Sequence, residues 1–387
     1  MKRVLILGAM TLALGACSLA PKYVQPAPPA PTSWPVGDAY LAQSEAALPR
    51  VTLNQLFRDA RLQALIEQAL ANNRDLRVAT ANVAAARAQV RVTRSAQFPA
   101  VGISGSADYS DGGLSGGASG AGRESYALQA GVSAFELDLF GRLANATAAE
   151  RERALATQAV ARTVRLSLIA DLAEAWANHA ADRELLSIAR DTADNARRSV
   201  TLTRARLDGG VAPRTDLRQA EQVLATAEGD LALQTAAVAQ DENLIRLLVG
   251  ADYDKALLPQ SLDEVSGSIA TLPAGTSSEI LLRRPDVVEA EYLLRAANAN
   301  IGVARARLFP TISLTGLLGF ASDALGSLIT GDALRFTGGA DASLSIFDAG
   351  GRRAGVAVSE AQRDAALASY ERAIQTAFRE VADALAD

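Results

Sequence analysis

The feature that most constrains the fold is a long stretch without helix-breaking residues. Between Gly141 and Gly209, 67 consecutive residues contain neither glycine nor proline. One helix of this length would span about 100 Å, whereas typical globular helices have about 8 to 20 residues. The stretch 141–208 is therefore predicted to be a single coiled-coil-like rod. Its apolar residues recur mostly every three or four positions, the spacing of one helix face: Leu155, Val160, Val164, Leu168, Leu172, Leu185 and Ile188.

Two shorter helical segments flank this rod. Positions 61–96 and 214–249 contain no proline, and only Gly229 interrupts the second segment. Their summed length nearly equals that of the rod, so the two could stack end to end along one long partner. A bent long helix would give the same pattern.

A predicted β-hairpin at 98–140 separates the first helix from the rod. Phe98-Pro99 ends the helix, and apolar residues then alternate with small or polar ones on both sides of a Gly/Ser-rich segment at 111–123. Alternation over about 9 to 11 residues fits a hairpin of a transmembrane barrel. The half-buried hairpin of a soluble sheet would show the same alternation, but the secretory N-terminus described below favours the barrel.

The same order of elements returns about 210 residues later. Phe98-Pro99 matches Phe309-Pro310 at an offset of 211, and the hairpin end at Asp138 matches Asp348 at an offset of 210. A tandem helix–hairpin–helix unit is therefore predicted. The second long helix should continue to about residue 418 by this offset, so we expect the second copy to lack about 70 to 90 residues. The predicted segments are a first repeat at 51–250, an equatorial linker at 251–278, and a second, incomplete repeat at 279–387 with its hairpin at 309–350.

The N-terminus has the pattern of a lipoprotein signal. Lys2 and Arg3 precede an apolar run at 4–14 that is too short to span a membrane as a helix. The sequence Leu-Gly-Ala-Cys ending at Cys17 resembles the bacterial lipobox, in which the cysteine is diacylated and becomes the new N-terminus. We therefore expect a signal peptide at 1–16 and a lipid-anchored extended segment at 17–50. An ordinary signal peptide with a chance cysteine is the alternative.

The composition excludes several classes of protein. Hydrophobic residues make up 49% of the chain and aromatic residues only 5%, so small apolar side chains must fill the contacts between closely packed helices. The formal charge of −5 argues against nucleic-acid binding. A single Cys and a single His exclude a disulfide framework and an ordinary zinc cluster.

These residues resemble one family, the outer membrane factors of tripartite efflux systems of the TolC and OprM type, and especially their NodT lipoprotein branch. The resemblance covers the chain from Cys17 to Asp387. It departs from the family near Leu56, where the family often has Trp, and in the missing C-terminal portion. The residues that carry it are Leu281 to Val287, Glu289 to Glu291, Gly302 to Pro310, and Pro21, Tyr23, Pro26 and Trp34.

The resemblance implies a mainly α fold with transmembrane β-strands. Each subunit of a homotrimer would give four strands to one 12-stranded barrel and its helices to a long coiled-coil-like periplasmic barrel. The implied partners are a periplasmic adaptor (a membrane fusion protein), an inner-membrane RND-type pump and outer-membrane lipid. No catalytic step, cofactor or metal is implied.

Two groups of residues are candidate functional sites. The turn formed by Gly209, Gly210, Val211, Thr215 and Asp216 resembles the helix-turn-helix tip at which an adaptor docks. Val211 offers an apolar knob there, and Thr215 or Asp216 can cap the next helix. A plain hairpin turn is the alternative for this stretch. Near it, Asp191, Asp194, Arg197 and Arg198 could line or latch the pore, or simply form a solvated helix face.

The function expected from this sequence is a passive outer-membrane conduit for drugs or other small molecules. Metal-ion efflux, type I protein secretion and a poreless structural lipoprotein that spans the periplasm are the alternatives. A hydrolase built around His179 is the most remote of them, because a triad would require this helix residue to reach a pocket. The sequence does not identify the exported substrate.

Overall fold

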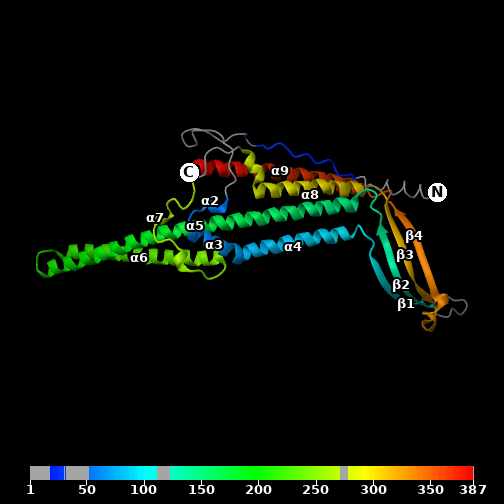
Figure 1. The fold of residues 1–387 in the computed structure, drawn as a ribbon, viewed down its shortest axis with the longest axis horizontal. Helices are drawn as coiled ribbons and strands as arrows, with labels where there is room; N and C mark the ends of the chain where they lie inside the picture. The colour runs from blue at the N-terminus through cyan, green and yellow to red at the C-terminus, as the bar shows by residue number, and fades with distance from the viewer. Residues whose placement is uncertain (1–17, 30, 32–51, 111–122, 271–277, 387) are drawn as a thin grey trace. The chain divides into compact units, whose positions relative to one another are not determined.

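The computed structural model describes residues 18–29, 31, 52–110, 123–270 and 278–386. The fold is mainly helical with one four-stranded antiparallel sheet (Figure 1). The helices are α2 (Leu53–Leu56), α3 (Ala60–Asn72), α4 (Arg74–Ser95), α5 (Arg142–Asp208), α6 (Arg214–Val249), α7 (Leu262–Val265), α8 (Pro285–Ala306) and α9 (Gly351–Ala386). The strands are β1 (Val101–Ser110), β2 (Arg123–Glu136), β3 (Thr311–Ser322) and β4 (Leu334–Ser343).

No helix in the described part of the chain has the length and apolar character needed to cross a membrane.

The chain separates into two compact units, and each unit draws on distant stretches of sequence. The helix α5 contributes to both units. Each unit also takes parts from both sequence repeats, so the units do not coincide with the repeats. The strand unit comprises Met1–Pro29, Val83–Gln158 and Asp286–Ala377, and the helical unit comprises Ala30–Asn82, Ala159–Pro285 and Phe378–Asp387.

In the strand unit the four strands are hydrogen-bonded in the order β1-β2-β3-β4. Each hairpin pairs its two strands without a register shift, and β2 joins the two hairpins by pairing with β3. The strands β1 and β4 are therefore the two edges of the sheet. The pairing runs from Val101↔Val132 to Ser110↔Arg123, from Tyr126↔Ser322 to Glu136↔Ser313, and from Thr311↔Ser343 to Phe320↔Leu334.

The contact between β2 and β3 contains a β-bulge. The register shifts between Val132 and Phe135, so two residues of β2 lie opposite one residue of β3. Ala134 has a φ of 54° in this bulge, and its N–H donates to Oγ1 of Thr315 over 3.2 Å. The threonine hydroxyl thus replaces the backbone acceptor that the bulge removes.

The segment that follows the predicted signal peptide is held against helices of the strand unit. Ser18 Oγ donates to Oδ1 of Asn145 over 2.9 Å, and Asn298 Nδ2 donates to the Pro21 carbonyl over 2.7 Å. A side chain at Gly302 would collide with this segment. The extended conformation is therefore fixed by side chains from α5 and α8, and not by its own backbone hydrogen bonds.

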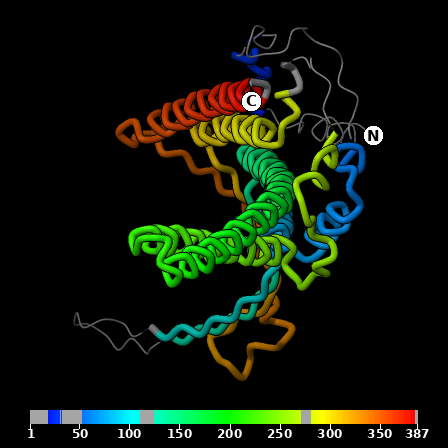
Figure 2. The backbone as a smooth tube through the Cα atoms, turned by 90° about the vertical axis from the view of Figure 1, so that its left-hand side faces the viewer, coloured from blue at the N-terminus to red at the C-terminus, as the bar shows by residue number. Residues whose placement is uncertain are grey.

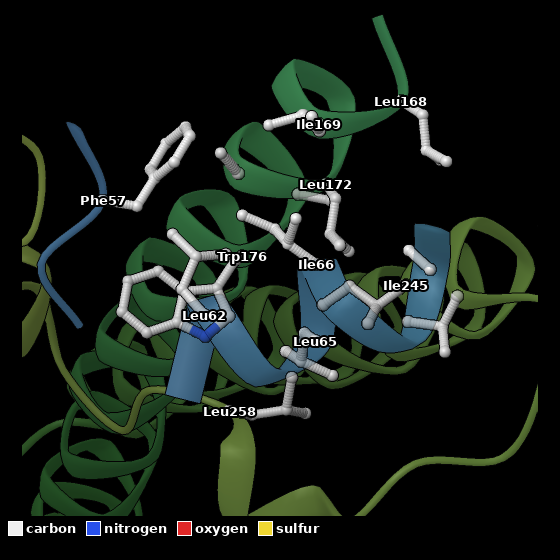
Figure 3. Packing of buried hydrophobic residues seen from close by; sticks show 14 residues of the cluster. Phe57, Leu62, Leu65, Ile66, Leu168, Ile169, Leu172, Trp176, Ile245 and Leu258 are labelled. Carbon is white, nitrogen blue, oxygen red and sulfur yellow. The ribbon is translucent and has the colours of Figure 1, made fainter. Parts of the chain in front are cut away.

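The helical unit has a core of large apolar side chains. Side chains from α3 point toward those from α5 and α6 (Figure 3). Trp176 also donates from Nε1 to the Leu257 carbonyl over 3.0 Å, so the polar end of its ring is satisfied. The buried members include Phe57, Leu62, Leu65, Ile66, Leu168, Leu172, Trp176, Ile245 and Leu258.

The predicted continuous helix over 61–96 is wrong, because Asn73 divides it into α3 and α4. Asn73 has an extended ψ of 136°. Its Oδ1 accepts from the Leu76 N–H over 3.0 Å, which caps α4, and its Nδ2 donates to the Leu248 carbonyl over 2.9 Å. Gly250 packs against the break, since a Cβ there would lie 2.7 Å from the Asn72 carbonyl oxygen. The helix is therefore interrupted by contacts with the end of α6.

The rest of α5 in the helical unit forms an antiparallel hairpin with α6, drawn in green in both views (Figure 1, Figure 2). The buried contacts of its distal part are made by Ala193, Ala196 and Ala227, with Leu224 and Leu231 packed beside them. Small side chains let two helix backbones approach closely, which accounts for the alanine-rich sequence.

Candidate functional site

The predicted docking turn closes the α5–α6 hairpin. The Val211 N–H donates to the Arg206 carbonyl over 2.9 Å, and Gly210 supplies a φ of 76°. These are features of a helix C-terminus that ends in a left-handed residue. The Val211 side chain is 69% exposed at the turn. The tip thus presents one apolar side chain on a fixed backbone.

Capping of α6 by Thr215 or Asp216 is wrong. The helix begins at Arg214 with Pro213 at the N-cap, and no side chain makes the cap hydrogen bond. Asp216 instead lies in the first turn, where a carboxylate interacts favourably with the helix dipole. Proline fixes an extended-to-helical entry and needs no N–H partner, so the capping role is not required.

The predicted gate residues lie on the exposed surface of the same hairpin. Arg197 pairs with Asp194 over 2.7 Å and with Glu228 of α6 over 3.2 Å. Arg198 donates to Oδ1 of Asn195 over 2.6 Å, and Asp191 is exposed. Within one chain, therefore, Arg197 links the two helices of the hairpin.

A second ionic link lies nearer the tip. Arg204 of α5 pairs with Glu221 of α6 over 3.0 Å, and Arg218 pairs with the other oxygen of the same carboxylate over 2.8 Å. The guanidinium groups of Arg218 and Arg204 hold the pKa of Glu221 below its ordinary value. These pairs fix the register of the hairpin more than its stability, because exposed ion pairs contribute little free energy.

A pair of carboxyl groups lies between α5 and α6 in the helical unit. Asp241 of α6 is hydrogen-bonded to Asp182 of α5, and its Oδ2 is buried. Burial first, and the neighbouring Asp182 charge second, raise the pKa of Asp241 to about 6. Two carboxyl groups in such contact share a proton more readily than they both ionise.

His179 is buried close to this pair but is not arranged for catalysis. Its side chain is 2% exposed, and burial lowers its pKa. In the described part of the chain no serine hydroxyl or carboxylate hydrogen-bonds to either ring nitrogen. A nucleophile and an orienting acid are both needed for a triad, and neither is in place around this ring.

The two outer strands present apolar side chains along unpaired edges. On β1, Val101 is 76% and Ile103 is 79% exposed, and Phe336 on β4 is similarly exposed. Ile346 and Phe347, directly after β4, are 97% and 86% exposed. Backbone edges and apolar side chains of this kind need either a partner strand or lipid.

The sequence of the whole chain decides the family. The pattern described as "Outer membrane efflux protein" matches residues 65–251 and 276–387. The chain belongs to this family. The expectation of an outer-membrane efflux channel component, and not an enzyme, is thereby confirmed.

Several relatives and solved structures agree with this assignment. The chain is 40% identical to the probable efflux pump outer membrane protein TtgC of Pseudomonas putida, over all of this chain and 80% of that protein. It is 38% identical to the cation efflux system protein CusC of Escherichia coli, over 97% of this chain and 81% of that protein. The open state of the Neisseria gonorrhoeae MtrE outer membrane channel superposes with a TM-score of 0.81 at 32% identity, covering 96% of this chain and 82% of that one. The predicted fold class is thus confirmed.

Some residues of the sites could not be identified from the sequence pattern. Cys17 lies outside the described residues. The Asp182–Asp241 pair and the partners Glu221 and Glu228 were not anticipated. A signal for them does exist, because residues at roughly equal distances from the 209–213 turn face each other in an antiparallel hairpin. Counting from the turn places each acidic residue of α6 near its partner on α5.

Proposed function

We propose that the chain is the outer-membrane channel subunit of a tripartite efflux system and that it assembles as a homotrimer. The observation that carries the proposal is the four-stranded sheet with two unpaired, apolar edges. In lipid, every backbone polar group needs a partner, so spanning sheets must close. Three copies would supply the 12 strands of one barrel.

The helices support a periplasmic conduit. The 67 residues of α5 give a rod of about 100 Å. Apolar side chains remain exposed on the α5–α6 hairpin of a single chain, and contacts with neighbouring copies would bury them. They include Leu166, Leu202, Val223, Leu233 and Leu247.

We further propose that Cys17 carries the lipid anchor in the outer membrane. Ser18, the next residue, bonds to Asn145 near the start of α5. The start of α5 follows β2 by a few residues, so the anchor would attach close to the barrel. Replacing Cys17 with Ala should abolish labelling by radioactive palmitate; continued labelling would disprove this role.

The tip is proposed as the docking site for a helical hairpin of a periplasmic adaptor. Exposed Val211 and the Gly209–Gly210 turn support this role. Asp191, Asp194, Arg197 and Arg198 are proposed to line or latch the tunnel nearby. Val211→Asp should reduce adaptor crosslinking and drug resistance while the channel still inserts, and unchanged values of both would sink the docking role.

The proposed cargo is a small organic molecule, delivered by an inner-membrane RND-type pump. The relative TtgC of a solvent-tolerant Pseudomonas putida strain is named for toluene efflux. The second candidate is a metal cation, since CusC is named for cation efflux at a similar identity. The sequence contains only two methionines, both in the predicted signal peptide, which favours organic cargo over a soft metal ion.

Conductance and growth tests separate these possibilities. The purified protein should form conducting channels in planar bilayers, and a poreless scaffold would not. Cells that lack the gene should become sensitive to toluene or to antibiotics, whereas sensitivity to copper or silver alone would favour the cation assignment. The absence of both conductance and any sensitivity would reject the channel proposal.

A further inference from the structure

The internal repeat gives a rule that relates the strands of the two hairpins. Residues of β3 follow their β1 counterparts by 211 positions, and residues of β4 follow their β2 counterparts by 210. The strand pairing supports these offsets independently of the sequence matches. Val101 pairs with Val132, and the corresponding residues Ile312 and Ala342 also pair.

The contact between β2 and β3 is the only one of the three strand contacts in the described sheet that joins different repeats. It carries the second strand of one repeat onto the first strand of the next. In a closed ring of chains, β4 meets β1 of the next copy, which is again a second strand meeting a first strand. The two contacts are therefore equivalent by the repeat.

We propose that β4 pairs with β1 of a second copy of this chain in the register that β2 has with β3. The inference rests on the proposed assembly and specifies its contacts. Val132 faces Gly316, and Ala130 faces Leu318, within one chain. The offsets then place Ala342 opposite Gly105 of the neighbouring copy, and Ala340 opposite Ala107 of that copy.

The hydrogen bonds around the bulge transfer with matching chemistry. Within one chain, the Ala134 N–H donates to the hydroxyl of Thr315. The equivalent residues are Leu344 and Ser104, and Ser104 also carries a hydroxyl group. The Ser104 hydroxyl of the neighbouring copy thus accepts the Leu344 N–H.

The segment after β4 gains a partner in this arrangement. The strand β2 continues past its bulge to Glu136, whereas β4 ends at Ser343. The following Ile346 and Phe347 are almost fully exposed in the single chain. Pairing with the neighbouring β1 extends β4 to Ile346, as β2 extends to Glu136.

Two positions differ between the contacts, and their surroundings accommodate the difference. Gly131 and Gly319 allow β2 and β3 to approach closely, since a Cβ on either would collide with backbone atoms of the opposite strand. Their equivalents are Asp341 and Asp108. In the proposed register these face Ser106 and Gly339, which are small residues, so the register leaves room for both carboxylates.

Disulfide crosslinking of the full-length chain in the outer membrane tests the register. The double variants A342C/G105C and A340C/A107C place cysteines directly opposite each other, where Cα atoms are about 4.5 to 5.5 Å apart. The matched variants A342C/A107C and A340C/G105C combine the same substitutions out of register, at about 7 to 8 Å, which is beyond disulfide reach. A130C/L318C is the control that bridges within one chain.

The expected result is a ladder of dimers and trimers on non-reducing gels, at least fivefold stronger for the two in-register variants than for the two out-of-register ones. The wild-type chain sets the background from Cys17. A stronger ladder from the out-of-register variants, or no ladder in a protein that is trimeric by native mass, overturns the register and leaves the channel proposal standing. A monomeric native mass in all variants and in the wild type overturns both.

Discussion

The carboxyl pair of Asp182 and Asp241 makes the stability of the helical unit depend on pH. The pKa of Asp241 is about 6 in the folded chain, against an ordinary value of 3.8. The folded state therefore holds its proton between about pH 4 and pH 6, while the unfolded chain has already released it. Stability falls as the pH rises through this window and stays low above it.

Replacing Asp241 with Asn removes the ionisable group and keeps the shape of the side chain. A pKa raised from 3.8 to about 6 corresponds to about 3 kcal/mol. Because the Asp241 side chain is only partly buried, solvent screening reduces the expected effect to about 1 kcal/mol. The variant should thus be more stable than the wild type by this amount at pH 8.

Chemical unfolding of the detergent-solubilised protein from pH 4 to pH 8 measures the effect. The gain from Asp241→Asn should shrink as the pH falls and vanish near pH 4. Asp230→Asn, at an exposed position on the same helix, serves as the control and should change stability little at any pH. A variant no more stable than the wild type at pH 8, or a gain that persists at pH 4, would refute the reasoning.

Three further substitutions test the fold. Leu172→Ala, in the fully buried core, should cost about 2 to 5 kcal/mol in chemical unfolding, and exposed Leu166→Ala should cost far less; similar costs would contradict the assigned core. Asn73→Ala should cost about 1 to 2 kcal/mol, because it removes the cap of α4; an unchanged unfolding midpoint would show that the cap is dispensable. Gly210→Ala should destabilise the tip by about 1 kcal/mol through its positive φ, seen as faster amide exchange there than in Gly209→Ala, and equal rates would contradict the turn geometry.

Local sequence patterns carried the regular parts of this fold. The helix α5 starts directly after Gly141 and ends directly before Gly209, so the two glycines that bound the pattern also bound the helix. The strands follow from period-two alternation in the same way. Both patterns depend on neighbours along the chain, and a reader of the sequence has these in view.

The parts that sequence reasoning missed depend on contacts between distant residues. Asn73 interrupts a helix that contains no glycine or proline there, because its amide bonds to Leu248, 175 residues away. The pairing of Asp182 with Asp241 likewise requires the packing of two helices. The roles of the tip and gate residues involve other chains, so they remain predictions for the crosslinking and resistance tests.

The alanine contacts of the distal hairpin have a mechanical consequence. Near Trp176, separating α5 from α6 would expose large buried side chains, but beyond Ala193 it would expose little more than methyl groups and break ion pairs that already face water. The work needed to part the two helices therefore falls steeply toward the tip. A partner that pulls on the turn should bend or splay only the distal segment, while the core around Trp176 acts as a fixed fulcrum.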